Sequence, residues 1–275
     1  MPELPEVETI KNQLSPVLPF KLDRVWLSPK TNRMLKARDF DPTNHSITEI
    51  TRHGKWLIFK LAPNGYFLSH LGMSGTWRIS DFPLGLKHGH IQLMDLTKKA
   101  NGVLTYEDPR RFGHFYILND ENFKKKYDSL PFDITSPEFT LEHFSLILFS
   151  NAEKVIKPFL LDQNFFPGVG NYIASEICAR GGILPTRTCG SLTEIEILKT
   201  YNAFKTVLNQ ALDTGGTTFG GGYRDTTGSK GEGVKNLVVF YQEYCQMCLK
   251  ENIKTKVVKT IMNTRGTYHC PRCQH

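Results

Sequence analysis

No apolar run in the 275-residue sequence approaches the roughly 20 residues that a membrane-spanning helix needs. The start lacks a basic stretch followed by an apolar run, so we expect no secretory signal. Internal repeats are absent too. Acidic residues are too few to balance the basic ones, because the net charge is +7 and the pI is near 9.0. That excess permits a polyanionic partner, of which nucleic acid is the commonest, although many basic proteins bind none.

Cysteine is sparse until the end of the chain. Cys178 and Cys189 are isolated, whereas the other four form two Cys-x-x-Cys pairs separated by 21 residues (Cys245, Cys248, Cys270 and Cys273). Pairs at this spacing match a tetrahedral zinc site, and without a secretion signal metal ligation is favoured over disulfides. Because four thiolates leave no open position for water, we expect one structural zinc ion per chain. Two unrelated thiol pairs are the weaker alternative.

Basic residues lie between the two cysteine pairs (Lys254, Lys256, Lys259 and Arg265). A rigid hairpin that carries them would suit contact with phosphate groups. A solubilising surface would have the same charge, so the pattern leaves both interpretations open.

The first eight residues, MPELPEVE, predict a helix start. Pro5 suits the first helical position, and the carboxylates of Glu6 and Glu8 fall in the first turn, where the helix dipole favours negative charge. An apolar face follows at helical spacing (Val7, Ile10, Leu14 and Val17). On composition alone, a well-formed helix start explains this stretch.

Residues 22–118 have the pattern of short strands. Two apolar runs flank Pro63-Asn64-Gly65, which predicts a hairpin, and further runs follow at regular spacing. We therefore expect a sandwich or a barrel. Residues 119–139 are polar and contain prolines, so we interpret them as a linker.

Beyond the linker the pattern is helical. Ser191 and Glu194 fit a capping box, and the helix that follows has its expected apolar face at four positions (Ile195, Leu198, Leu208 and Leu212). Gly215-Gly216 would end that helix. The next stretch, 217–233, is rich in Gly, Thr and Ser, and a loop of this length is normally either functional or disordered.

Two further patterns suggest binding surfaces. Gly168-x-Gly170-Asn171 precedes a short predicted helix, and a helix start after a glycine turn can bind an anion, although such turns are common. Met73 in HLGMSG and Arg110 and Phe112 in DPRRFG lie in predicted turns. Exposed apolar side chains can wedge into a base stack and Arg can pair with base edges. Burial of Met73 and Phe112 beside an ion-paired Arg is the alternative, which the residues alone slightly favour.

Together these motifs resemble the formamidopyrimidine-DNA glycosylase (Fpg/Nei) family of base-excision repair enzymes, Fpg-type. The resemblance rests on MPELPEVET, HLGMSG, DPRRFG, GVGN and the terminal four-cysteine hairpin, which span essentially the whole chain. It implies a bifunctional DNA glycosylase and AP lyase that excises oxidised purines such as 8-oxoguanine and formamidopyrimidines.

The resemblance also implies a set of catalytic residues. Removal of Met1 would leave Pro2 as an amine that forms a Schiff base with the sugar, with Glu3 as proton donor and Glu6 in support. Lys55 and Arg265 match basic residues beside the phosphates of the lesion. DNA contacts are implied for six further residues, of which Met73, Arg110 and Phe112 would fill the gap left by the flipped nucleotide (His70, Met73, His88, Arg110, Phe112 and Asn171).

The implied fold class is α+β. A two-sheet β-sandwich with an N-terminal helix would cover 1–118, followed by the linker 119–139, a helix-two-turn-helix domain with a lesion loop at 140–234, and a zinc hairpin at 235–275. Double-stranded DNA with a damaged base would be the partner of a monomeric, cytoplasmic, nucleoid-associated bacterial enzyme.

Three departures from the family pattern bear on lesion preference. The gap between the cysteine pairs is longer than usual, GNYIASE transposes the common GNIYASE, and 217–233 carries extra glycines. A Nei-type enzyme for oxidised pyrimidines is therefore an alternative. A zinc-containing protein that binds DNA without chemistry is a second one, against which the Pro2–Glu3 pair argues.

Overall fold

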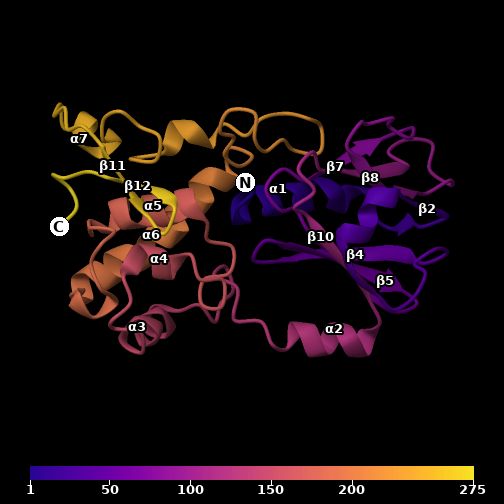
Figure 1. Cartoon of the computed structure of the whole chain (residues 1–275), viewed down its shortest axis with the longest axis horizontal. Helices are drawn as coiled ribbons and strands as arrows, with labels where there is room; N and C mark the ends of the chain where they lie inside the picture. The colour runs from indigo at the N-terminus through magenta and orange to yellow at the C-terminus, as the bar shows by residue number, and fades with distance from the viewer. The chain divides into compact units, whose positions relative to one another are not determined.

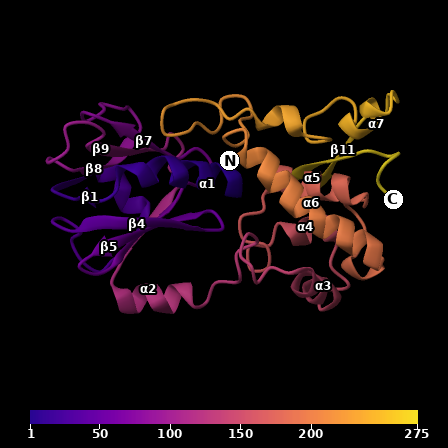
Figure 2. The same cartoon turned by 180° about the vertical axis from the view of Figure 1, so that it is seen from behind.

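The computed structural model describes residues 1–275, which form two compact units. Unit 1 comprises Met1–Leu130 together with Thr214–Glu232, and unit 2 comprises Pro131–Asp213 together with Gly233–His275. Figures 1 and 2 show the indigo and purple strands of unit 1 and the orange and yellow helices of unit 2. No helix is both long enough and apolar enough to cross a membrane.

The strands of unit 1 form two sheets. The larger is six-stranded in the order β1-β4-β5-β6-β10-β3 (Phe20–Lys21, Ser46–His53, Trp56–Ala62, Tyr66–His70, His114–Leu118 and Leu35–Arg38). The smaller is four-stranded in the order β2-β8-β9-β7 (Arg24–Leu27, Gly89–Met94, Val103–Glu107 and Thr76–Ser80). Strands β3 and β10 pair in parallel, whereas β5 and β6 form the antiparallel hairpin predicted at Pro63-Asn64-Gly65.

Aromatic side chains from both sheets meet in one core. Phe59 of β5 contacts Trp77 of β7 with ring centroids 5.6 Å apart, and Tyr106 of β9 contacts Phe115 of β10 at 4.6 Å. All four side chains are buried in the same apolar cluster, so the sheets pack face to face. The predicted β-sandwich is confirmed.

Helix α1 (Leu4–Leu14) packs against both sheets, through β4 and β5 of one and β7 of the other (Figure 1). Its predicted apolar face is buried (Val7, Ile10, Leu14 and, just beyond the helix, Val17). Pro5 lies in the first turn, where its missing N–H costs no intrahelical hydrogen bond. The start of the helix is thereby fixed in the wall of the sandwich.

Two segments of unit 1 differ from the sequence-based expectation. Helix α2 (Asp120–Tyr127) occupies part of the expected linker, and its Phe123 ring stacks on Tyr66 at 3.6 Å between centroids. The segment Thr214–Glu232, expected in the helical domain, groups with unit 1. The reason is a set of hydrogen bonds from this segment to α1 and β7, which a pattern of Gly, Thr and Ser does not reveal.

Unit 2 is helical with one small hairpin. Its helices are α3 to α7 (Leu141–Phe149, Ile156–Leu160, Asn171–Gly181, Glu194–Leu212 and Gln246–Lys250), and its strands are β11 and β12 (Val258–Met262 and Arg265–His269). Short 3-10 turns complete the helical structure of the chain (Ser15–Val17, Pro29–Arg33, Cys189–Ser191 and Gly233–Asn236). As predicted, α5 begins after Gly170 and ends at Gly181. It is capped by Gly182, whose φ of 74° lies in the left-handed region that suits glycine.

The start of α6 corrects two expectations. Thr193 and Glu196 form the capping box, not Ser191 and Glu194, because Ser191 is held in a 3-10 turn that precedes the helix. The expected apolar face is wrong at its first two positions, since Ile195 is 66% exposed and Leu198 is 44% exposed. The buried face runs instead through other positions of α6 (Ile197, Ala203, Phe204, Val207, Leu208 and Ala211).

A buried carboxylate links α5 to the segment before the cysteines. Glu176 accepts the backbone N–H groups of Val238, Val239 and Phe240 at 2.6, 2.9 and 2.9 Å. Burial raises its pKa, and the three donors oppose that shift. Glu176 is the last residue of the GNYIASE motif, so part of that motif serves to anchor the chain that enters the cysteine hairpin.

Candidate active site and nucleic-acid interface

Pro2 and Glu3 are buried immediately before α1. The backbone N–H of Glu3 donates to Oε2 of Glu6 at 2.7 Å, as in a capping box. The other oxygen of Glu6, Oε1, accepts the backbone N–H of Thr217 at 2.7 Å. The fully buried Glu6 carboxylate thus holds the backbone beside Pro2 and also the start of the glycine-rich loop. The supporting role in catalysis that the resemblance implies for Glu6 stays a prediction.

Two loops that carry candidate DNA contacts are held together by Asp108, which is buried. Its Oδ1 accepts hydrogen bonds from the Ser74 hydroxyl at 2.5 Å and the Arg110 backbone N–H at 3.2 Å. Its Oδ2 accepts the Gly113 backbone N–H at 2.8 Å. The Asp108 side chain therefore joins HLGMSG, at 70–75, to DPRRFG, at 108–113. This role explains why an Asp begins the second motif.

The glycines of these motifs allow a close approach of Tyr106. A Cβ atom at Gly75 or at Gly113 would overlap the Tyr106 hydroxyl. That hydroxyl donates to the Leu71 carbonyl at 3.2 Å, between the two loops. Gly72 has a φ of 66° and lies against the backbone of Phe112. The loops are thus packed backbone to backbone, which only glycine permits at these positions.

This packing leaves the loop tips exposed. Met73 is 38% exposed and Phe112 is 52% exposed, so the alternative that both are buried is wrong. The Arg110 guanidinium lies 4.7 Å from the centroid of the Phe112 ring, a cation–π contact. The structure therefore presents an apolar and cationic surface from two loops whose bases are rigid.

His70 lies at the end of β6 and is kept neutral. Burial, followed by the nearby His114 and Lys55, lowers the pKa of His70 to about 3. The Gly72 backbone N–H donates to Nδ1 of His70 at 3.1 Å, so in the neutral ring the hydrogen resides on Nε2. His114 stacks on His70 with centroids 4.6 Å apart. Lys55, in the turn between β4 and β5, is also mostly buried.

The two histidines of the HGH motif have different environments. His88 is half-buried, and only its backbone carbonyl has a described contact, with the Asp108 N–H at 2.9 Å. His90 is buried, and its ring nitrogens lie 3.2 Å from the Ser28 hydroxyl and 3.0 Å from the Asp108 carbonyl. Both ring nitrogens of His90 therefore have partners inside the protein. Of the two histidines, only His88 is partly exposed.

In unit 2, a buried lysine positions Asn171 at the start of α5. Lys157 Nζ donates to Asn171 Oδ1 and to Thr267 Oγ1, both at 2.8 Å. Asn171 Nδ2 in turn donates to the Gly266 carbonyl at 3.0 Å. The exposed Arg265 is the neighbour of Gly266, so Asn171 and Arg265 come together within this unit. Sequence reasoning missed Lys157, since its partners are 14 and 110 residues away along the chain.

The four C-terminal cysteines fit one zinc ion. Their Sγ atoms all lie within 4.8 Å of one another, as a tetrahedral site with Zn–S bonds of about 2.3 Å requires. The 21-residue spacing does not lengthen the tip of the hairpin, because β11 and β12 are joined by Asn263 and Thr264 alone. Helix α7 and the turn after it take up residues next to the first cysteine pair.

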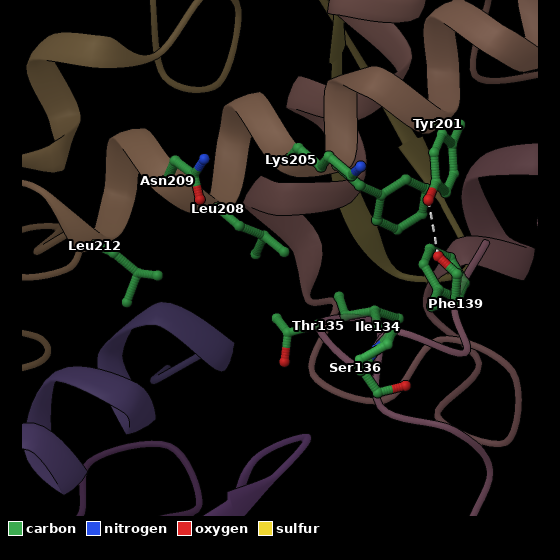
Figure 3. A pocket seen from close by; sticks show the side chains of 11 residues that line it. Ile134, Thr135, Ser136, Phe139, Tyr201, Lys205, Leu208, Asn209 and Leu212 are labelled. Atoms are coloured by element: carbon green, nitrogen blue, oxygen red, sulfur yellow. Dashed lines mark hydrogen bonds between the residues drawn. The ribbon is translucent and has the colours of Figure 1, made fainter. Parts of the chain in front are cut away.

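A separate cavity of about 380 Å³ in unit 2 lies between α6 and residues 134–139 (Figure 3). Its lining mixes apolar and polar side chains, and the Tyr201 hydroxyl donates to the Phe139 carbonyl at 2.9 Å across one end. None of the predicted catalytic, DNA-binding or metal residues lines it. This cavity is therefore not part of the predicted site.

Known protein families match segments of both units. The family model of the formamidopyrimidine-DNA glycosylase N-terminal domain matches residues 1–115, and the model of the formamidopyrimidine-DNA glycosylase H2TH domain matches residues 130–221. A curated formamidopyrimidine-DNA glycosylase from Syntrophomonas wolfei is 35% identical over 280 residues, with 100% of both chains covered.

Solved structures agree with the sequence comparison. The chain is similar to the MutM (Fpg) protein from Thermus thermophilus, with 31% identity, a TM-score of 0.84, and 99% of this chain and 98% of that chain covered. It is also similar to a variant of the Lactococcus lactis Fpg protein in complex with DNA that contains Fapy-dG. There the identity is 28%, the TM-score is 0.86, and 100% of both chains is covered.

Proposed function

The chain belongs to the formamidopyrimidine-DNA glycosylase family, and on that premise we propose that it excises oxidised purines from double-stranded DNA and then cleaves the strand. The Fapy-dG in the DNA bound by the Lactococcus lactis relative supports this class of lesion. The observation that carries the proposal is the joint exposure of Met73, Arg110 and Phe112 on two loops clamped by Asp108.

Base release would begin at Pro2. Once Met1 is removed, the Pro2 nitrogen is the α-amino group of the chain, and α-amino groups have pKa values of about 8, so part of it is unprotonated near neutrality. Its lone pair attacks C1′ of the damaged nucleotide as the glycosidic bond breaks. The electron pair of that bond leaves with the base, which takes up a proton in exchange for the one that the Pro2 nitrogen gives up. Glu3 donates a proton to the sugar ring oxygen, the ring opens, and an iminium links Pro2 to C1′.

Strand cleavage would follow from the same intermediate. The iminium acidifies the C2′ hydrogen, so that loss of this proton expels the 3′ phosphate, and a second elimination expels the 5′ phosphate. Water then hydrolyses the Schiff base and frees Pro2. Glu6 would keep the backbone at Glu3 in place during these steps through its hydrogen bond to the Glu3 N–H.

The other candidate residues would bind the flipped nucleotide and its flanks. Flipping costs a few kcal/mol of stacking and pairing, and insertion of Met73 and Phe112 into the gap would offset part of it, with Arg110 facing the orphaned base. Phosphate contacts are assigned to four residues, of which neutral His70 would donate from Nε2 (Lys55, His70, Asn171 and Arg265). His88 would also contact the DNA.

The zinc ion would have a structural role. Four thiolates complete its coordination, so it would stabilise the hairpin that bears Arg265 and take no part in bond breaking. The bacterial relatives support a place for this enzyme in the bacterial cytoplasm. We expect it to act there as a monomer on chromosomal DNA.

A panel of lesion duplexes tests the proposal. Duplexes with a single 8-oxoguanine, formamidopyrimidine or oxidised pyrimidine are incubated with the purified enzyme, and strand cleavage is followed on denaturing gels. The expected result is preferential cleavage at the two purine lesions. Faster cleavage at the oxidised pyrimidine would favour the Nei-type alternative. Binding without cleavage of any duplex would favour the DNA-binding protein without chemistry.

A further inference from the structure

Gln13, near the end of α1, is joined to the glycine-rich loop by three hydrogen bonds. Its Nε2 donates to Asp225 Oδ2 at 2.8 Å. Its Oε1 accepts the Thr226 backbone N–H at 3.0 Å and the Thr226 hydroxyl at 2.9 Å. Both polar atoms of one amide side chain are therefore used to hold two consecutive loop residues.

The residues that Gln13 holds are already a rigid turn. Asp225 Oδ1 accepts the backbone N–H groups of Thr227 at 3.0 Å and Ser229 at 2.8 Å, which fixes the turn from within. Strand β7 adds a second support: Arg78 donates to the Asp225 carbonyl at 3.2 Å and to the Glu107 carboxylate at 3.1 Å. The turn is thus held from two sides, by Gln13 of α1 and by residues of β7.

The same helix face holds the beginning of the loop. Glu6 and Gln13 are seven residues apart, two helical turns, and so point to the same side of α1. Glu6 accepts the Thr217 N–H, and Gln13 binds Asp225 and Thr226. Between these two attachment points, a Cβ at Gly220 or Gly221 would meet no atom within 4 Å, so the loop is not packed against other atoms on that side of these two glycines.

We propose that Gln13 is a positioning residue for recognition of the damaged base. It would hold the loop against α1, so that a base received by the loop lies in register with the nucleophile at the start of the same helix. This inference rests on the proposed function. Because the loop would contact the base and not the sugar, Gln13 would matter for base excision and not for cleavage at a site that has already lost its base.

Two substitutions separate the contacts of Gln13. Gln13→Ala removes all three hydrogen bonds. Gln13→Glu keeps an acceptor for Thr226 but places a second carboxylate beside Asp225, which is repulsive. Asn12→Ala is the matched control, since Asn12 lies on the exposed side of the same helix turn. All variants are prepared as full-length chains with zinc bound and Met1 removed.

Three measurements are made on each variant. Single-turnover excision is followed on an 8-oxoguanine duplex, and strand cleavage is followed on a duplex with a preformed abasic site. Limited trypsin digestion without DNA reports the loop directly, because Arg224 and Lys230 are exposed cleavage points within it. We expect Gln13→Ala and Gln13→Glu to slow excision roughly tenfold, which corresponds to the net contribution of about one hydrogen bond, and to speed loop digestion.

The control and the abasic-site reaction decide the interpretation. Unchanged abasic-site cleavage by both Gln13 variants, with Asn12→Ala like the parent in every assay, supports the positioning role. Equal loss of excision and abasic-site cleavage would overturn it, as would excision at the parental rate despite faster loop digestion. If the parent protein cleaves neither duplex, the proposed function is refuted, and the digestion assay still tests the role of Gln13. Loop digestion at the parental rate in Gln13→Ala would refute the attachment of the loop by Gln13.

Discussion

The close packing of Tyr106 against Gly113 predicts that Gly113→Ala destabilises the protein and that Tyr106→Phe partly relieves this loss. In Gly113→Ala the new Cβ would overlap the Tyr106 hydroxyl and would lie 2.9 Å from Tyr106 Cζ and 3.0 Å from the His70 carbonyl. Overpacking of a tight core costs about 1–3 kcal/mol, and we expect about 3 kcal/mol of unfolding free energy to be lost here. Tyr106→Phe should cost about 1 kcal/mol, because it removes the hydrogen bond to the Leu71 carbonyl.

The double variant should be more stable than the sum of the single effects predicts. Without the hydroxyl, the worst overlap is gone and only the contacts near 2.9 and 3.0 Å remain. We therefore expect a total loss of about 2 kcal/mol, which is a favourable coupling of about 2 kcal/mol. Gly85→Ala is the control: a Cβ there meets nothing within 4 Å, so the change should be below about 0.5 kcal/mol.

Urea unfolding followed by tryptophan fluorescence measures these effects. The 3 tryptophans all lie in unit 1 (Trp26, Trp56 and Trp77), so the signal reports that unit alone. Trp77 is also in edge contact with Tyr106, at 5.4 Å between ring centroids. Losses that simply add, within about 0.5 kcal/mol, would refute the packing of Tyr106 between the two motif loops.

Three further predictions follow from the two units. Chelation of zinc, or Cys248→Ser, should disorder the hairpin and weaken binding to undamaged duplex DNA, measured by fluorescence anisotropy with zinc content as the control. Lys157→Met should weaken binding about tenfold in the same assay, since loss of its hydrogen bonds releases both Asn171 and Thr267; unaltered affinity would contradict its positioning role. The pKa of His70, about 3 in the folded state against 6.5 for the free side chain, makes the unfolded state bind the proton first, so unit 1 should lose stability as pH falls from 6.5 towards 3. The slope from this group is at most about 1.4 kcal/mol per pH unit, and His70→Gln should remove it from urea unfolding curves recorded between pH 7 and 5.

Much of the fold could be predicted from local patterns in the sequence. The apolar face of α1, the turn at Pro63-Asn64-Gly65 and the helix after GVGN depend on residues close together in the chain, and all are observed. The zinc site could also be predicted from the sequence, because the type and the spacing of its ligands nearly specify it. The buried positions of α6 could not be predicted in this way. Ile195 and Leu198 are as hydrophobic as the residues that are buried, and only tertiary packing decides which apolar side chains are covered.

Side chains that act over long distances in the sequence escaped prediction. Asp108, Lys157 and Gln13 are ordinary polar residues until folding brings their partners to them from 34, 110 and 212 residues away. The exposure of Met73 and Phe112 was likewise undecided by composition, because it depends on how Tyr106 and two glycines close the loops beneath them. Motif resemblance supplied that answer where pattern alone slightly favoured burial.

Chemical trapping of the Schiff base tests the central claim most directly. The enzyme is mixed with a duplex that holds one 8-oxoguanine opposite cytosine, sodium borohydride is added, and the covalent adduct is digested and mapped by mass spectrometry. The account predicts one adduct, on the nitrogen of Pro2 in chains that have lost Met1, and none in chains that retain it. An adduct on a lysine, or efficient strand cleavage by chains that retain Met1, would contradict it.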